Sequence, residues 1–388
     1  MFEMNMRTEP VSGRLVIDLA AIQTNYRFLC SIAAPAPVAA VVKADAYGLG
    51  AVAVSKALCA IGCQDFFVAH LNEAVAIVPH LPSAARVYVL NGLMPGEEGQ
   101  CADLGVIPVL NGVEQVENWA RLARSQGGML PAVLQVDSGM SRLGLSLAEA
   151  SAIAHNKPLR DMLDLKWLIS HLACADERDS EQNLHQLATF RDACALFPET
   201  PGCFANSGGI FLGADFRGAM VRSGIALYGG APTSGGPNPM TPVVSLTVPV
   251  VQTRRVSTGA KVGYGGAFQA DRPMVLATIA AGYADGLPRS LGDFGAAWLG
   301  AIRLPIVGRV SMDTMTIDIS HLDPGTVGLG TQVELIGHNS PIDAVAEAAG
   351  TISYEILTRL GRRFRRVLIE AVSPPPSANS QSEEELRL

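Results

Sequence analysis

Charged and aromatic residues are both scarce in this sequence, and the two shortages limit what the chain can be. Charged residues make up 17% of the 388 residues and aromatic residues 6%, whereas 48% are hydrophobic. A chain with so little charge and so much apolar material can fill a large core, which excludes global disorder. At roughly 150 residues per domain, this length predicts two or three domains.

Positive charge and long hydrophobic runs are also in short supply. The 29 Lys and Arg residues are outnumbered by 36 Asp and Glu residues, so the formal net charge is −7. This balance argues against a nucleic-acid-binding protein, whose surface is basic, and we interpret the basic cluster at 362–366 as a solvated face. No run of about 18 apolar residues occurs, so we expect no membrane-spanning segment. The first ten residues lack the apolar core of a signal peptide.

Cysteine occurs seven times, an odd number with irregular spacing, and no cysteine follows Cys203. A disulfide framework is therefore not expected, and a reducing compartment, the cytoplasm, is the expected location. Cys59 and Cys63 lie four residues apart without a second such pair. No cluster of His, Cys and Asp has the spacing of metal ligands, so we expect no bound metal.

Apolar runs alternate with amphipathic stretches through the first two thirds of the chain. Eight strand candidates lie between residues 38 and 230, and they are near-continuous apolar runs, as expected of parallel strands covered on both faces. Eight strand–helix units of about 25 residues favour a (β/α)8 barrel, the TIM-like fold, over an open doubly wound sheet. We predict this α/β barrel domain over residues 12–235.

The composition changes after Gly230. Residues 231–242 are rich in Pro and Gly and are typical of a linker. Short β-branched runs separated by turns follow, and only 342–350 and 352–360 have a helical pattern. This pattern of short β-branched runs and turns predicts a mainly antiparallel β domain over 236–373, followed by a disordered tail at 374–388. The first apolar run, at 14–19, could add a strand to either domain.

Polar residues fall at the carboxyl ends of the strand candidates, where the loops of a barrel build its active site. Five of them end a strand candidate, and Arg222 lies within the eighth; the five are Lys43, Arg142, His171, Asn206 and Ser207. A purely structural origin would scatter such residues over loops and helix faces. Their placement therefore predicts a functional site at one rim of the barrel.

Lys43 leaves three chemical roles open: a phosphate ligand, an ion-pair partner or a Schiff-base former. Two segments help to choose between them. Residues 206–209 follow the seventh strand candidate, and Gly224 and Ile225 follow Arg222, where barrels of this kind commonly bind phosphate. A Schiff-base lysine, a phosphate cradle and a charged group for a ring nitrogen together indicate pyridoxal 5′-phosphate (PLP).

Several motifs carry a resemblance to a known family. They begin with the segment around Lys43 and continue in chain order; the segments are 41–50, 136–144, 170–173, 205–207, 221–225, 262–265, 282–286, 308–313 and 354–355. In these segments the sequence resembles alanine racemase, a PLP enzyme with an α/β barrel followed by a β domain. The motifs span about residues 12 to 372 in the order of the family.

The resemblance implies a reaction and its two catalytic residues. Lys43 would hold PLP as an internal aldimine and act as a base on one face of the substrate Cα. Tyr264 of the partner subunit would be the second base, on the opposite face. Removal and return of the proton would interconvert L-alanine and D-alanine, and the enzyme would be a homodimer with shared active sites.

Further binding roles are implied in the same way. Arg222, held by His171, would face the pyridine nitrogen, and since an arginine is not deprotonated at ordinary pH it would leave the ring a weaker electron sink. Arg142 would bind the phenolic oxygen of PLP and the substrate carboxylate. The implied phosphate site comprises Tyr47, Asn206, Ser207, Gly224, the backbone N–H of Ile225, and Tyr354. On the substrate side the resemblance adds Tyr283, Met312 and Asp313.

One position departs from the family pattern. Many members have a carbamylated lysine where this chain has Gln135, and that carbamate orients the arginine corresponding to Arg142. Glutamine forms no carbamate. Either its amide oxygen orients Arg142, a small anion such as chloride fills the gap, or Arg142 has other partners.

Other functions remain open from the sequence. A racemase of broader specificity, a PLP barrel decarboxylase or aldolase, and a non-enzymatic PLP-binding protein share parts of the pattern. Decarboxylases usually place a carboxylate at the ring nitrogen, and the binding proteins lack a second domain. D-alanine is a peptidoglycan precursor, and the sequence leaves both its biosynthesis and its catabolism open. The remaining histidines have no motif around them and are interpreted as structural: His70, His80, His155, His185, His321 and His338.

Overall fold

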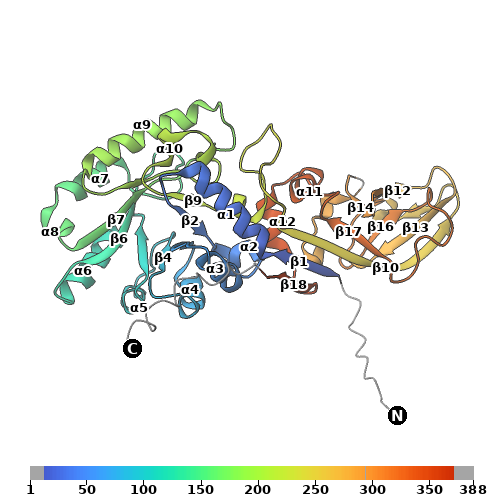
Figure 1. Ribbon diagram of the computed structural model, residues 1–388. Helices are drawn as coiled ribbons and strands as arrows, with labels where there is room; N and C mark the ends of the chain where they lie inside the picture. Colours follow the sequence, from blue (N-terminus) through green and yellow to red (C-terminus); the bar gives the residue numbers. More distant parts are fainter. Residues whose placement is uncertain (1–12, 293, 371–388) are drawn as a thin grey trace, which may run out of the picture.

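The computed structural model describes residues 13–292 and 294–370. They form a barrel domain and a β domain that lie side by side along one axis (Figure 1). The predicted tail at 374–388, the residues before Gly13 and the last three residues of the predicted β domain lie outside the described residues. No helix in the described part of the chain is long and apolar enough to cross a membrane.

Eight parallel strands form the barrel. Their order around it is β8-β7-β6-β5-β4-β3-β2-β9. The strands are β2 (Val38–Val41), β3 (Asp65–Val68), β4 (Arg86–Val89), β5 (Ile107–Leu110), β6 (Leu130–Gln135), β7 (Leu163–Ile169), β8 (Gly202–Cys203) and β9 (Val221–Ser223). The seam between β8 and β9 is bridged by a hydrogen bond from the Arg222 N–H to the Ala205 carbonyl (2.9 Å). The predicted (β/α)8 barrel is confirmed, with all eight strand candidates.

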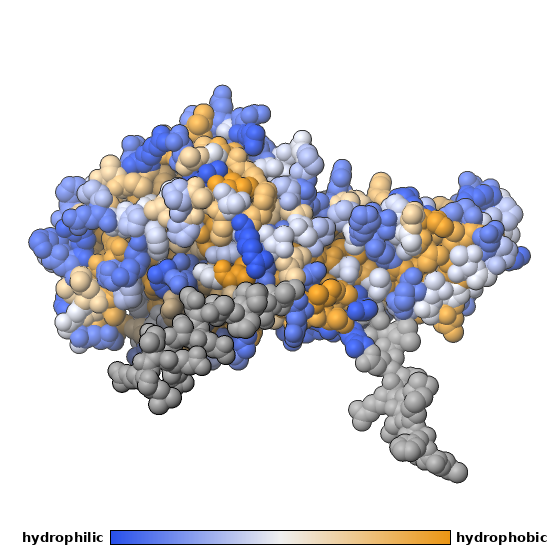
Figure 2. All heavy atoms as spheres, in the orientation of Figure 1, coloured by the Kyte–Doolittle hydropathy of each residue, from blue (hydrophilic) through white to orange (hydrophobic). Residues whose placement is uncertain are grey.

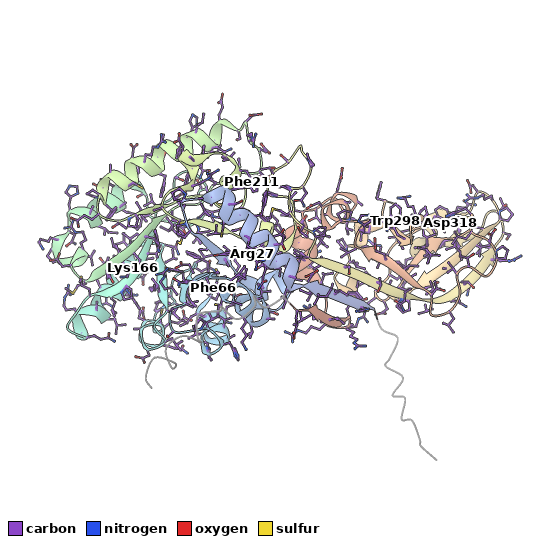
Figure 3. The ribbon with its side chains drawn as sticks, viewed as in Figure 1. Arg27, Phe66, Lys166, Phe211, Trp298 and Asp318 are labelled. Carbon is purple, nitrogen blue, oxygen red and sulfur yellow. The ribbon has the colours of Figure 1, made fainter. Side chains whose placement is uncertain are left out.

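Helices cover the outside of the barrel. The longer ones are α1 (Leu19–Ala33), α3 (Ala51–Cys59), α4 (Leu71–Ile77), α6 (Val113–Ser125), α7 (Leu147–His155) and α9 (Glu181–Leu196); shorter elements are α5 (Glu98–Asp103), α8 (Lys157–Arg160) and α10 (Ala214–Arg217). Apolar strand residues such as Phe66 (Figure 3) and Leu134 are completely buried, because each strand is enclosed on both faces. The continuous apolar runs of the sequence therefore have a direct structural cause.

The amino-terminal ends of two barrel strands are joined by a charged contact. Asp65, the first residue of β3, is buried and accepts two hydrogen bonds from the guanidinium of Arg86, at 2.6 and 2.7 Å. The Tyr88 hydroxyl also donates to Asp65 at 2.9 Å and accepts from the indole of Trp167 at 3.2 Å. This network lies at the opposite ends of the strands from Lys43, which is the stabilising face of a barrel.

The second domain is built on a sheet of eight strands, which includes Trp298 and Asp318 (Figure 3). Its path is β15-β14-β17-β10-β1-β18, and β13 pairs with β10 and β16. The bounds are β1 (Arg14–Asp18), β10 (Val244–Val256), β13 (Met274–Ile279), β14 (Ala296–Leu299), β15 (Ile302–Pro305), β16 (Met315–Asp318), β17 (Gln332–Ile336) and β18 (Arg365–Ile369). All pairs are antiparallel except β1 with β18, so the predicted mainly antiparallel domain is confirmed.

The first strand belongs to this second sheet. β1 pairs with β10 and β18, although the barrel helix α1 follows it directly. The sequence missed the short strands β14, β11 (Lys261–Val262) and β12 (Phe268–Gln269). Two-residue strands show no periodicity, and the run AAWL of β14 has neither β-branched residues nor clear alternation.

Two helices of the second domain reach the barrel. They are α11 (Ile342–Ala348) and α12 (Ser353–Arg359), and both match the helical patterns of the sequence. α12 packs against α2 (Lys43–Gly48), the segment that begins with Lys43. Asp343 of α11 accepts hydrogen bonds from the Ala231 N–H and the Asn238 side chain, so the linker is fastened to the same helix pair.

Gly286 follows Tyr283 in the same loop and packs closely against the end of α12. Its φ is +94°, and a Cβ at this position would overlap the carbonyl oxygen of Arg359 at the end of α12. We expect Gly286→Ala to lower the free energy of unfolding by about 3 kcal/mol or more, measured as a shift of the urea midpoint. Gly96 is the matched control, because its φ is +96° and nothing lies within 4 Å of its Cβ position. Gly96→Ala should cost only the backbone strain, about 1–2 kcal/mol; equal losses in both variants would contradict the prediction.

Candidate active site

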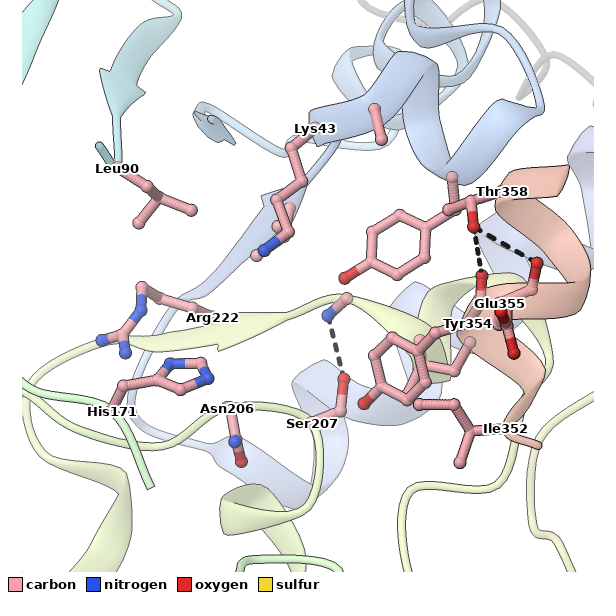
Figure 4. A pocket seen from close by; sticks show the side chains of 15 residues that line it. Lys43, Leu90, His171, Asn206, Ser207, Arg222, Ile352, Tyr354, Glu355 and Thr358 are labelled. Carbon is pink, nitrogen blue, oxygen red and sulfur yellow. Dashed lines mark hydrogen bonds between the residues drawn. The ribbon is translucent and has the colours of Figure 1, made fainter. Parts of the chain in front are cut away.

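Two adjoining cavities open at the carboxyl ends of the barrel strands. The first has a volume of about 380 Å³ and the second about 420 Å³. The residues shared by both linings are Lys43, Ala44, Leu90, His171 and Arg222. Lys43 points into the space from one side, opposite Arg222 and His171 (Figure 4). The lysine amine therefore lies where the two cavities meet.

The first cavity is lined by both domains. The barrel contributes Tyr47, Asn206, Ser207, Gly224 and Ile225 besides the shared residues, and α12 with the residue before it contributes Ile352, Tyr354, Glu355 and Thr358. The predicted PLP residues other than Arg142 are thus together in one cavity. The second cavity is lined by Arg142, Gln135, His70 and Glu73, among others.

The backbone that follows Lys43 is strained. Four successive residues, from Ala44 to Tyr47, have φ between 53° and 57°, the left-handed region that costs a non-glycine residue about 1–2 kcal/mol. Hydrogen bonds hold this turn: the Ala51 N–H donates to the Asp45 carboxylate at 2.7 Å, and the Ala44 N–H donates to Glu73 at 2.7 Å. The turn places Lys43 and Tyr47 on the same cavity.

The second domain also supports this turn. A Cβ on Gly48, whose φ is +83°, would lie 2.9 Å from the Leu357 carbonyl oxygen of α12. The Arg366 guanidinium of β18 donates to the Gly48 carbonyl. The basic cluster at 362–366 therefore contributes specific contacts: Arg363 donates to Asp285 and Asp313.

The environment of Lys43 shifts its amine toward the neutral form. Burial lowers the pKa of Lys43, and the positive charges of Arg142 and Arg222 lower it further, whereas the carboxylate of Glu73 raises it. A neutral lysine amine is the form that attacks a carbonyl carbon. Of the three roles that the sequence left open, the lowered pKa agrees with the Schiff-base role.

Arg222 is a buried cation whose guanidinium is held by backbone carbonyls. Its outer nitrogens donate to the carbonyl oxygens of Cys203 (2.7 Å) and Ser170 (2.5 Å), and also to the Cys203 sulfur (3.0 Å). Among the described residues, no carboxylate forms an ion pair with it. His171 lies beside it (Figure 4), and burial together with the charge of Arg222 lowers the pKa of His171 to about 3.

A group of donors converges on the other end of the first cavity. The Ser207 hydroxyl oxygen accepts hydrogen bonds from the N–H groups of Gly224 (2.9 Å) and Ala226 (3.4 Å), at the start of the short helix η3 (Ile225–Tyr228). A Cβ on Gly224 would overlap the Tyr47 hydroxyl, so only glycine fits between the tyrosine and this turn. Burial raises the pKa of Tyr47 and raises that of Tyr354 to about 12, which keeps both hydroxyls protonated as donors.

The prediction that Arg142 ends a strand is wrong. β6 ends at Gln135, and Arg142 lies on the exposed loop beyond it. Gln135 is buried, and its amide N–H donates to the Leu143 carbonyl at 3.1 Å. Both side chains line the second cavity, and what orients Arg142 stays a prediction.

The remaining predicted residues lie elsewhere. Tyr264, Tyr283 and Met312 are 69%, 43% and 52% exposed, and neither they nor Asp313 line either cavity. Tyr264 begins the short helix η4 (Tyr264–Gly266), directly before β12, which lies at the end of the β domain away from the barrel (Figure 1). Hydrophobic patches interrupt the hydrophilic surface of this domain (Figure 2).

Sequence reasoning missed some residues of the site. Glu73 bonds to the lysine turn, and His70, interpreted as structural, lines the second cavity with Leu90 and Asn91. A glutamate three residues after a helix N-cap is a capping-box pattern, so Glu73 had an ordinary explanation in the sequence. Its contact with Ala44 depends on the pairing of β2 with β3, which no local pattern shows.

The fold and the site together define a class: two-domain barrel proteins in which a lysine of lowered pKa shares a cavity with a group of hydroxyl and backbone N–H donors. Comparison with known proteins narrows the class. Two family models match, the N-terminal domain of alanine racemase over residues 17–232 and the C-terminal domain over 243–368. The chain belongs to the alanine racemase family.

Relatives and solved structures agree with this assignment. The chain is 54% identical to a catabolic alanine racemase of Agrobacterium fabrum over 95% of both chains, and 50% identical to an alanine racemase of Brucella abortus over 95% and 96%. It resembles the crystal structure of alanine racemase from Bartonella henselae with covalently bound pyridoxal phosphate, with a TM-score of 0.89 and 42% identity. That match covers 93% of this chain and 100% of the other.

The lowered pKa of His171 has a consequence for stability. Between pH 6.5 and about 3 the unfolded chain binds a proton at this imidazole and the folded protein does not, so stability falls as the pH falls through this window. At pH 5 the loss is about 2 kcal/mol. We expect His171→Asn to flatten the pH dependence of the urea midpoint between pH 7 and pH 5. A wild-type imidazole that titrates near pH 6.5 by NMR would contradict this.

Proposed function

We propose that this chain interconverts L-alanine and D-alanine with PLP as its cofactor. One observation carries the proposal. The amine of Lys43 lies between Arg222, a buried arginine held by backbone carbonyls, and a group of hydrogen-bond donors that could hold a phosphate. The names of the relatives support alanine as the substrate.

The residues of the cavity fit PLP at both of its ends. The Ser207 hydroxyl, the Ile225 N–H, Tyr47 and Tyr354 would hold the phosphate, and Asn206 would shape the turn after β8 by accepting from the Gly209 N–H at 2.9 Å. When bound, PLP supplies an aldehyde for the Lys43 amine and a ring that withdraws electrons from Cα. Arg142, with its guanidinium in the second cavity, is free to bind a carboxylate.

The positive charge of Arg222 itself helps to distinguish between the reactions that a PLP enzyme can catalyse. A carboxylate partner at this position would keep a ring nitrogen protonated by accepting its N–H, whereas a guanidinium donates a hydrogen bond and keeps its proton. A ring nitrogen without a full proton would withdraw electrons from Cα less strongly, which favours return of the proton to Cα. Arg222 therefore favours racemisation over transamination.

Two bases on opposite faces complete the proposed mechanism. Lys43 removes or returns the Cα proton on one face, and Tyr264 of the partner subunit acts on the other. The exposure of Tyr264, Tyr283 and Met312 supports this arrangement, since in a twofold dimer each β domain can cover the other subunit's barrel mouth. We place the reaction in the cytoplasm, which the seven unpaired thiols of the chain support.

Chiral chromatography of alanine tests the proposed reaction. L-alanine incubated with the PLP-loaded protein should approach an equal mixture of L- and D-alanine, without release of CO₂ or aldehyde. Lys43→Ala should abolish both this activity and the visible absorbance of the bound cofactor, because the covalent link is lost. Released CO₂ or aldehyde, or unchanged absorbance in Lys43→Ala, would contradict the proposal.

Mixed dimers test the shared site. Lys43→Ala and Tyr264→Phe should each be nearly inactive, but a mixed dimer has one site with both lesions and one with neither. Random reassembly of equal amounts makes about half the dimers mixed, so about a quarter of all sites should regain activity. If Tyr264 serves its own barrel instead, the mixture stays inactive although subunit exchange is demonstrated by mass spectrometry.

A further inference from the structure

Glu73 joins two loops of the barrel rim through one carboxylate. Its Oε1 accepts a hydrogen bond from the Ala44 N–H at 2.7 Å, directly after Lys43. Its Oε2 accepts from the Ala69 N–H at 2.6 Å and from the His70 N–H at 3.3 Å, at the start of α4. The same side chain therefore ties the strained turn after β2 to the loop after β3.

A role in capping α4 explains only part of this geometry. A capping-box glutamate needs one oxygen, which accepts from the N–H of its N-cap residue. Glu149 shows that simpler case at the start of α7: its recorded hydrogen bonds go to the N–H and the hydroxyl of Ser146, three residues away. Glu73 makes the equivalent bond to His70 and uses its other oxygen for Ala44, 29 residues away.

Glu73 also supplies negative charge where the site has a surplus of cations. Of the described residues that line the second cavity, Glu73 is the one carboxylate, and Lys43, Arg142, Arg222, His70 and His171 line the same cavity. In the first cavity, Glu355 is ion-paired with Arg359 at 2.7 Å, and the neighbouring hydroxyls are Tyr47 and Tyr354. Asp45, next to the lysine, accepts from the Ala51 N–H instead.

We propose that Glu73 is a positioning residue of this site: it holds the Lys43 turn in its left-handed conformation and balances the cations that face the Lys43 amine. The proposal rests on the proposed function, because that function gives Lys43 its chemical role. The negative charge of Glu73 opposes the effect of Arg142 and Arg222, which lower the pKa of Lys43. The hydrogen bond to Ala44 supports a turn whose backbone energy is otherwise unfavourable.

The test compares three variants of the full-length protein: Glu73→Gln, Glu73→Asp and, as the matched control, Glu149→Gln. Competitive acetylation with acetic anhydride over a range of pH, read by mass spectrometry after PLP is removed, gives the midpoint at which Lys43 becomes reactive. kcat and KM are measured separately on the PLP-loaded proteins. Circular dichroism confirms that each variant is folded.

Glu73→Gln should move the Lys43 midpoint to lower pH and lower kcat about tenfold with little change in KM, since it removes a charge and a charge-assisted hydrogen bond. Glu73→Asp keeps the charge but is too short to reach both Ala44 and Ala69, so kcat should fall while the midpoint stays. Glu149→Gln, which loses only a capping carboxylate, should change neither quantity.

An unchanged midpoint in folded Glu73→Gln, or an equal shift in Glu149→Gln, would overturn the proposal. If Glu73→Gln does not fold, the proposal is tested by Glu73→Asp alone. A wild-type kcat in Glu73→Asp would then overturn it. Acetylation of Lys43 requires no turnover of alanine. A wild-type protein that fails to racemise alanine would therefore refute the proposed function separately, with the labelling comparison still valid.

Discussion

The left-handed turn from Ala44 to Tyr47 is the constraint on which the site depends. Four residues with side chains adopt a conformation that each disfavours, so the turn persists only because its surroundings hold it. The support comes from three directions: Glu73 of the next barrel unit, Leu357 of α12, and Arg366 of β18. Lys43 is consequently placed by the whole fold rather than by its own strand.

The same contacts make the two domains one functional unit. The first cavity is lined by residues of the barrel and of α12. The chain also passes directly from β1, a strand of the second sheet, into α1, the first helix of the barrel. A small relative movement of the domains would change the distance between Tyr354 and the Ser207 cradle. Tyr264 and Met312 are exposed and lie outside the two cavities that contain Lys43. In the proposed dimer they would reach the site of the partner subunit.

Local charge at the site is opposite to the charge of the whole chain. The protein has a formal net charge of −7, yet Lys43, Arg142 and Arg222 converge on the two cavities with Glu73 as their counter-charge. Such a surplus of cations attracts the phosphate and carboxylate groups of small ligands, while the negative surface outside repels polyanions. The neutral His171 fits between these cations because a second positive charge beside Arg222 is unfavourable.

The sequence by itself predicted the eight barrel strands, the antiparallel domain, and the group of residues that lines the first cavity with Lys43. Apolar runs, glycines and family motifs are local in the chain, and these features depend on local pattern. The tertiary structure decided what local pattern does not record. It placed β1 in the second sheet, Arg142 on a loop beyond β6, and Glu73 against the lysine turn. Each of these depends on pairing between distant segments, where burial and hydrogen bonding over the whole fold outweigh the preference of any single stretch.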